Sequence, residues 1–295
     1  MSDLRSLRWS EEGRNWPLRE HSRFLVAGGV RWHVQVLGAG PVLLLIHGSG
    51  AATHTWRGLA PRLAERFTVV APDLPGHGFS SVPTVSQQTM RGFACGLGAL
   101  LDALATGPPL ALVGHSAGAA VAARLALDGI VRPQRLVALS AALLPLPGLP
   151  GLLFGPAARL LAGRMTLARL VAVQGRQASA VRRLLDSSGS RIDAEGLRLY
   201  QCLLSNPVHV SNVLKTMANW DLGGLVRELP ALPCPITLIH GADDAMIPVR
   251  EVDRLRRRLP AFESRILPGL GHLAHEEAPD RVATELIDLL GRGAG

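Results

Sequence analysis

The fold is decided by one stretch of the chain, Leu110-Ala111-Leu112-Val113-Gly114-His115-Ser116-Ala117-Gly118-Ala119-Ala120. Its apolar first part has the length of a strand, and its Ala-rich last part has helical character. Gly114 and Gly118 lack the Cβ atoms that would clash in a sharp strand-to-helix turn. Such a turn strains Ser116, exposes its Oγ and sets the Ala117 N–H at a helix start, where it can donate to an oxyanion. The alternative is a tight turn with an inert serine.

Strand-like and helix-like patterns alternate on both sides of this stretch. Residues 24–27 and 30–37 predict an antiparallel pair around a Gly28-Gly29 turn. Further strands are expected over residues 41–46, 67–72, 110–114, 136–140, 235–241 and 264–267. Helices are expected over residues 56–66, 89–104, 249–259 and 279–290. This alternation predicts an α/β protein with a mostly parallel sheet and helices on both faces.

The alternation stops between residues 141 and 230. Helices are expected there over residues 152–165, 166–173, 178–186, 194–205 and 208–218. We interpret this span as a helical lid inserted into a core formed by residues 1–140 and 231–295. Ligand chemistry in parallel sheets lies at the carboxyl ends of the strands, so the lid is expected above that edge.

A serine hydroxyl needs a base to accept its proton and an acid to orient that base. His272 follows the last strand in a Gly-rich loop, which favours it as the base over His275 in the next helix. The spacing G-x-x-D-x-x-x-P after the preceding strand favours Asp244 as the acid over Asp243. The order Ser116, acid, histidine is that of one hydrolase fold.

The loop His47-Gly48-Ser49-Gly50 follows a predicted strand and is expected to supply the second oxyanion donor. The Ser49 N–H is favoured and Gly50 is the alternative, while His47 is expected to orient the loop. Asp73 is expected to shape the neighbouring loop. The residues expected to contact substrate are Gly50, His115, Leu144 and Phe154.

Composition limits the function classes. The 295 residues carry a net charge of +8, and all but one of the 31 basic residues are arginine. Acidic residues are interspersed among the arginines, so we expect no nucleic-acid partner. The three cysteines are widely spaced, no metal-ligand spacing occurs, and residues 1–20 lack an apolar signal segment. We therefore expect a cytoplasmic protein with no metal and no organic cofactor.

The four motif loops, in this order, make the chain resemble the α/β-hydrolase superfamily over nearly its whole length. Serine at position 116 argues against haloalkane dehalogenases and epoxide hydrolases, which place an aspartate there. The His47-Gly48-Ser49-Gly50 loop is also similar to loops of serine C–C bond hydrolases and of cofactor-free haloperoxidases or esterases. The resemblance implies hydrolysis of an ester-like bond, with C–C bond hydrolysis or perhydrolysis as alternatives.

A closer resemblance is to the magnesium-chelatase accessory proteins of bacteriochlorophyll synthesis. The segments that carry it are Asn15-Trp16-Pro17, Ser22-Arg23-Phe24, residues 28–35, residues 114–120, Ser190-Arg191-Ile192-Asp193 and Met217-Ala218-Asn219-Trp220-Asp221. This resemblance implies a tetrapyrrole ester as a candidate substrate and magnesium chelatase as a candidate partner. The competing interpretation is a porphyrin-binding or chelatase-assisting protein with a vestigial triad. Peripheral contact of the apolar lid with a membrane stays open.

Overall fold

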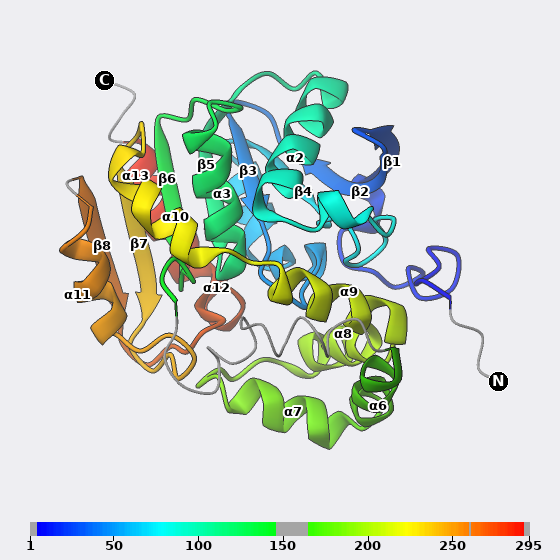
Figure 1. Ribbon diagram of the computed structural model, residues 1–295. Coiled ribbons are helices and arrows are strands. Elements are labelled where there is room, and N and C mark those ends of the chain that lie inside the picture. The colour runs from blue at the N-terminus through cyan, green and yellow to red at the C-terminus, as the bar shows by residue number, and fades with distance from the viewer. Residues whose placement is uncertain (1–4, 146–164, 260, 292–295) are drawn as a thin grey trace.

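The computed structural model describes residues 5–145, 165–259 and 261–291 (Figure 1). These residues form one eight-stranded sheet in the order β1-β2-β4-β3-β5-β6-β7-β8. The strands are β1 (Ser22–Ala27), β2 (Val30–Leu37), β3 (Val42–Ile46), β4 (Thr68–Pro72), β5 (Pro109–His115), β6 (Arg135–Leu139), β7 (Ile236–Gly241) and β8 (Phe262–Leu267). The pairs β1–β2 and β2–β4 are antiparallel, and all other neighbouring strands are parallel. The predicted α/β fold class is confirmed.

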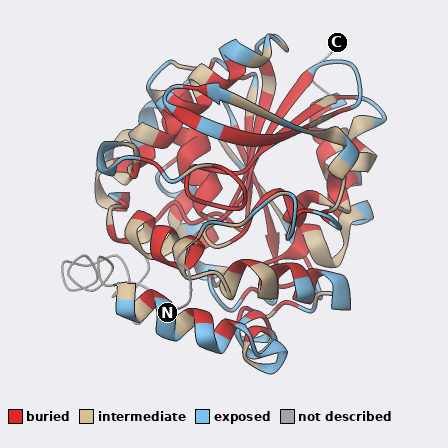
Figure 2. Cartoon of the chain, turned by 90° about the vertical axis from the view of Figure 1, so that its right-hand side faces the viewer, coloured by how far each residue is buried: buried red, intermediate tan, exposed pale blue. Residues whose placement is uncertain are grey.

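Helices cover both faces of the sheet. The core helices are α1 (Leu59–Ala64), α2 (Met90–Leu104), α3 (Ala117–Leu127), α11 (Arg250–Arg256), α12 (Ala274–Glu277) and α13 (Pro279–Gly291). Short 3₁₀ turns are η1 (Arg19–His21), η2 (Thr53–Trp56), η3 (Val85–Gln87) and η4 (Leu229–Ala231). Because successive strand side chains point to opposite faces, Leu44 and Leu112 pack toward α2 and α3, whereas Leu45 and Val113 pack toward α1 and α13. The central strands are accordingly almost wholly buried (Figure 2).

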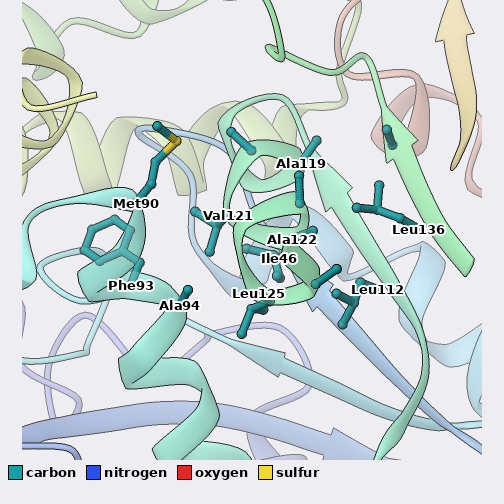
Figure 3. Close-up of a cluster of buried hydrophobic side chains, with 14 of the residues drawn as sticks. Ile46, Met90, Phe93, Ala94, Leu112, Ala119, Val121, Ala122, Leu125 and Leu136 are labelled. Atoms are coloured by element: carbon teal, nitrogen blue, oxygen red, sulfur yellow. The ribbon is translucent and has the colours of Figure 1, made fainter. Parts of the chain in front are cut away.

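The helix α3 packs unusually close to the sheet because its first turns are built from Gly and Ala. A Cβ placed on Gly118 would lie 2.1 Å from the Ile46 carbonyl oxygen, and one on Gly114 would lie 2.5 Å from the Ala119 backbone. Figure 3 shows Val121 and Leu125 of α3 in the apolar cluster with α2 and the strands. This close packing of α3 against the sheet fixes the position of Ser116, the residue just before α3.

Between β6 and β7, the described residues form five α-helices, which we call the inserted helices. They are α6 (Met165–Gly175), α7 (Ala178–Asp186), α8 (Ala194–Leu204), α9 (Pro207–Ala218) and α10 (Leu222–Glu228). Figure 1 shows α6 to α9 gathered at the same end of the sheet as α12. The expected helix over residues 152–165 falls almost wholly outside the described residues. The division into a core and a lid stays a prediction.

Several boundaries differ from the sequence expectation. The helix α10 was not predicted from the sequence. Asp221 caps its first turn by accepting from the Gly224 N–H. The two glycines of α10 weaken the helical pattern, so this cap was overlooked. The helix predicted over residues 249–259 covers only Arg250–Arg256. The last strand starts at Phe262 rather than Ser264, because its pairing with β7 begins at Ile236. In the described part of the chain, no helix is long and apolar enough to cross a membrane.

Candidate active site

The nucleophile candidate Ser116 lies between β5 and α3 with strained backbone angles. Its φ is 50° and its ψ is −117°, outside the regions that an L-residue prefers. Its N–H donates to the Leu139 carbonyl, and its carbonyl accepts from the N–H groups of Ala119 and Ala142. These hydrogen bonds to α3 and to the residues around the end of β6 hold the turn in its strained conformation. Strain of this kind is typical of functional positions.

The base candidate His272 follows β8 and is hydrogen-bonded to the acid candidate Asp244. The His272 Nδ1 lies 2.9 Å from Asp244 Oδ2, and both side chains are buried. The other oxygen, Asp244 Oδ1, accepts the N–H groups of Met246 and Ile247 at 2.9 and 2.8 Å. Burial by itself raises the pKa of Asp244, but the hydrogen bond and charge of His272 and the Ile247 N–H hold it below its usual value. A carboxylate held in this way keeps one orientation and one charge state.

The two alternative candidates, Asp243 and His275, do not form this pair. Asp243 is exposed to solvent. His275 is 1% exposed, and its Nε2 is 2.7 Å from Thr55 Oγ1. The structure therefore pairs His272 with Asp244, whereas His275 is hydrogen-bonded to Thr55.

The side chain of His115 links the nucleophile turn to the base. Its Nε2 donates to the His272 carbonyl oxygen at 3.1 Å, and its ring lies 4.9 Å from that of His272 and 4.4 Å from that of His275. Burial lowers its pKa to about 3, so the ring is neutral at pH 7. In the described residues, the hydrogen bond of the His272 ring is the one to Asp244, and none joins it to the Ser116 hydroxyl; catalytic hydrogen bonds often become short only when substrate binds.

The oxyanion candidates have free donors. In the ranges that the structure describes, the backbone N–H groups of Ala117 and Ser49 meet no acceptor. His47 orients the second loop, because its Nε2 accepts the Leu74 N–H at 2.9 Å and its Nδ1 donates to the Gly48 carbonyl at 2.8 Å. Among the described residues, a Cβ placed on Gly50 would meet no atom within 4 Å, so there is open space at that point of the loop.

The remaining substrate candidates differ in position. Leu144 is 3% exposed and belongs to the main apolar cluster. Phe154 lies outside the described residues. Contact of Gly50, His115, Leu144 and Phe154 with substrate stays a prediction.

The loop after β4 supports the oxyanion loop from behind. The Asp73 carboxylate accepts from the backbone N–H groups of Thr53 and Phe79 at 2.6 and 2.9 Å, and lies 2.7 Å from His33 Nδ1. These partners are groups of the protein's own loops and strands, so Asp73 has a structural role here.

The histidines around the site form a feature that the sequence reasoning missed. Besides His115 and His275, burial lowers the pKa of His47, His54, His77 and His209, the last to about 4. His209 of α9 accepts the Gly78 N–H at Nδ1 (3.3 Å) and donates from Nε2 to the Gly50 carbonyl (3.4 Å). An inserted helix thus contacts the oxyanion loop directly. No cluster of three potential metal-ligating side chains occurs in the described ranges.

Comparisons with known proteins identify the family and the fold. The model of the "Alpha/beta hydrolase family" matches residues 43–285. The magnesium-chelatase 30 kDa subunit of Rhodobacter capsulatus is 39% identical, over 94% of this chain and 96% of that protein. A pimeloyl-[acyl-carrier protein] methyl ester esterase of Methylococcus capsulatus is 31% identical, over 86% of this chain and 97% of that protein. The crystal structure of a putative lipase from Acinetobacter baumannii has the same fold, with a TM-score of 0.75 and 21% identity over 99% of this chain and 98% of the other.

Proposed function

The chain belongs to the α/β-hydrolase family, and on that premise we propose that it is a serine hydrolase acting on an ester-like acyl bond. The observation that carries the proposal is the buried His272–Asp244 hydrogen bond of 2.9 Å, which His115, the neighbour of a serine held at φ 50°, joins to the nucleophile turn through the His272 carbonyl. Neither feature is needed for packing, because a strained serine and a buried ion-pairing group each cost stability. Together they favour nucleophilic catalysis.

In the proposed reaction, the Ser116 hydroxyl attacks the acyl carbon while the His272 Nε2 takes up its proton. Asp244 holds the imidazole through Nδ1 and stabilises the imidazolium that forms. The oxygen of the tetrahedral intermediate accepts from the Ala117 and Ser49 N–H groups. One such donor contributes about 3 kcal/mol to transition-state stabilisation. The proton then passes from His272 to the leaving alcohol, and water attacks the acyl-enzyme by the reverse sequence.

We further propose a place for this activity in tetrapyrrole metabolism, beside magnesium chelatase. The similarity to a magnesium-chelatase subunit supports it, because that similarity extends over 94% of this chain, including the inserted helices. A tetrapyrrole ester is then the candidate substrate. The free cysteines Cys95, Cys202 and Cys234 fit a reducing compartment, and we place the protein in the cytoplasm.

A second candidate function is a non-catalytic one, in which the protein binds a porphyrin or assists the chelatase. The name of the R. capsulatus relative favours it, since that name states a subunit and no reaction. In this case the Ser116 turn would be retained without use.

A fluorophosphonate probe separates the two candidates, because it phosphonylates only an activated serine. We expect rapid labelling of the intact chain, and none of the Ser116→Ala or His272→Ala variants. The exposed Ser187 and the half-buried His21 provide matched controls, and Ser187→Ala and His21→Ala should label as fast as the parent chain. Absence of labelling in a folded parent chain, together with binding of protoporphyrin IX, would favour the second candidate.

A further inference from the structure

A short segment between α7 and α8, residues 188–191, lies against both catalytic loops. We call residues 242–247 the acid loop and residues 268–273 the base loop. The Ser188 carbonyl oxygen accepts the Ala245 N–H of the acid loop at 3.1 Å and the His272 N–H of the base loop at 3.3 Å. One oxygen of an inserted segment therefore joins the two loops that carry Asp244 and His272.

The contact is closer than side chains would permit. Gly189 has a φ of +80°, and a Cβ on it would lie 2.0 Å from the Asp243 carbonyl oxygen. A Cβ on Gly271 would in turn lie 2.3 Å from the Gly189 carbonyl oxygen. Glycine on each side lets the backbone of the segment sit directly on the backbones of both loops.

Three successive N–H groups of the base loop are held by segment 188–191, directly or through a second residue. The His272 N–H donates to Ser188, and the Leu273 N–H donates to Ser190 Oγ at 2.8 Å with both residues buried. The Gly271 N–H donates to Glu277 Oε1 at 2.9 Å, and Glu277 Oε2 accepts the Arg191 N–H at 3.0 Å. The backbone on both sides of the base is thus held by the segment, directly or through the Glu277 carboxylate.

We propose that segment 188–191 is a positioning element of the catalytic pair, with Ser190 and Glu277 as its positioning residues. This inference rests on the proposed hydrolase function and specifies what the insertion contributes to it. A base displaced by a fraction of an ångström loses transition-state stabilisation but leaves substrate binding intact. Loss of a positioning contact therefore lowers kcat and leaves KM unchanged.

The test compares Ser190→Ala with Ser187→Ala in the full chain, with p-nitrophenyl butyrate as the probe. Ser187 lies three residues away and is exposed, and within the described residues its hydroxyl donates to the Leu184 carbonyl of α7. We expect kcat of Ser190→Ala to fall about tenfold, with KM within twofold of the parent value. Ser187→Ala should match the parent in both constants.

A second readout does not depend on turnover. The proton on His272 Nδ1 should give a downfield proton NMR signal, assigned by its loss in His272→Ala. We expect this signal to shift or broaden in Ser190→Ala and to stay in place in Ser187→Ala. Glu277→Gln keeps one acceptor oxygen and should give a smaller change in the same direction, which provides a test if Ser190→Ala does not fold.

The outcomes separate this inference from the proposed function. Parent-like kcat and NMR signal in both Ser190→Ala and Glu277→Gln would overturn the positioning role, as would a rise in KM equal to the fall in kcat. If the parent chain neither hydrolyses the probe nor labels with fluorophosphonate, the proposed function fails. The NMR comparison then decides the positioning role alone.

Discussion

The buried histidines should make the fold sensitive to mild acid, and His209 offers the sharpest test. Burial, more than the charge of His47, lowers the pKa of His209 to about 4, whereas an unfolded histidine titrates near 6.5. The folded-state pKa lies below the unfolded one, so the unfolded chain binds the extra proton first. Stability is therefore full above about pH 6.5 and is lost as the pH falls toward 4.

The magnitude follows from linkage. Between pH 7.0 and 5.5 the unfolded chain takes up most of a proton at this position and the folded chain almost none, which costs about 1.2 kcal/mol. Burial lowers the pKa of four further histidines at least as clearly, namely His54, His77, His115 and His275. Each of these histidines adds to the loss of stability in acid in the same direction, and a typical domain is stabilised by only about 5–15 kcal/mol.

The assay is urea unfolding at pH 7.0 and 5.5. His209→Gln keeps a donor for the Gly50 carbonyl but cannot be protonated, so its loss of stability over this interval should be about 1.2 kcal/mol smaller than that of the parent chain. His21→Gln, at a half-buried position on the surface, should behave as the parent does. An identical loss in the parent and in His209→Gln would refute the reasoning, because it would mean that folded His209 takes up the proton as readily as the unfolded chain.

Three further predictions concern the site and its support. Asp244→Asn should lower kcat about 10⁴-fold through the wrong imidazole tautomer, whereas Asp243→Asn should stay within threefold, both measured with p-nitrophenyl butyrate. Gly118→Ala should lower the melting temperature sharply or prevent folding, since its Cβ would meet the Ile46 carbonyl oxygen at 2.1 Å, and a thermal scan checks this. Glu276→Gln should cost about 1.5–3 kcal/mol in urea unfolding, because it removes the buried charge opposite the Arg57 guanidinium, which keeps its exposed partner Asp193; a cost under about 0.5 kcal/mol would contradict the reasoning.

Much of the fold could be predicted from local patterns. The strand periodicity, the Gly28-Gly29 turn and the Gly114–Gly118 turn each depend on neighbouring residues, so the positions of the strands along the chain and the nucleophile turn could be predicted from the sequence, whereas the order of the strands in the sheet came only from the structure. The helix α10 did not, because Gly223 and Gly224 weaken the helical pattern and only the Asp221 cap favours it. The choice of Asp244 over Asp243 rested on spacing, and the hydrogen bond to His272 agrees with it.

The sequence by itself determined the fold class, the order of the motif loops and which residue types could carry hydrolysis, because these depend on contacts between near neighbours. Only the tertiary structure decided which residues contact the motif loops. The contact of Ser190 with Leu273 spans 83 residues, and that of Tyr200 with Glu276 spans 76. The hydrophobic periodicity of a sequence does not indicate partners so far apart along the chain, because these pairs form only when the sheet brings both segments to the same edge.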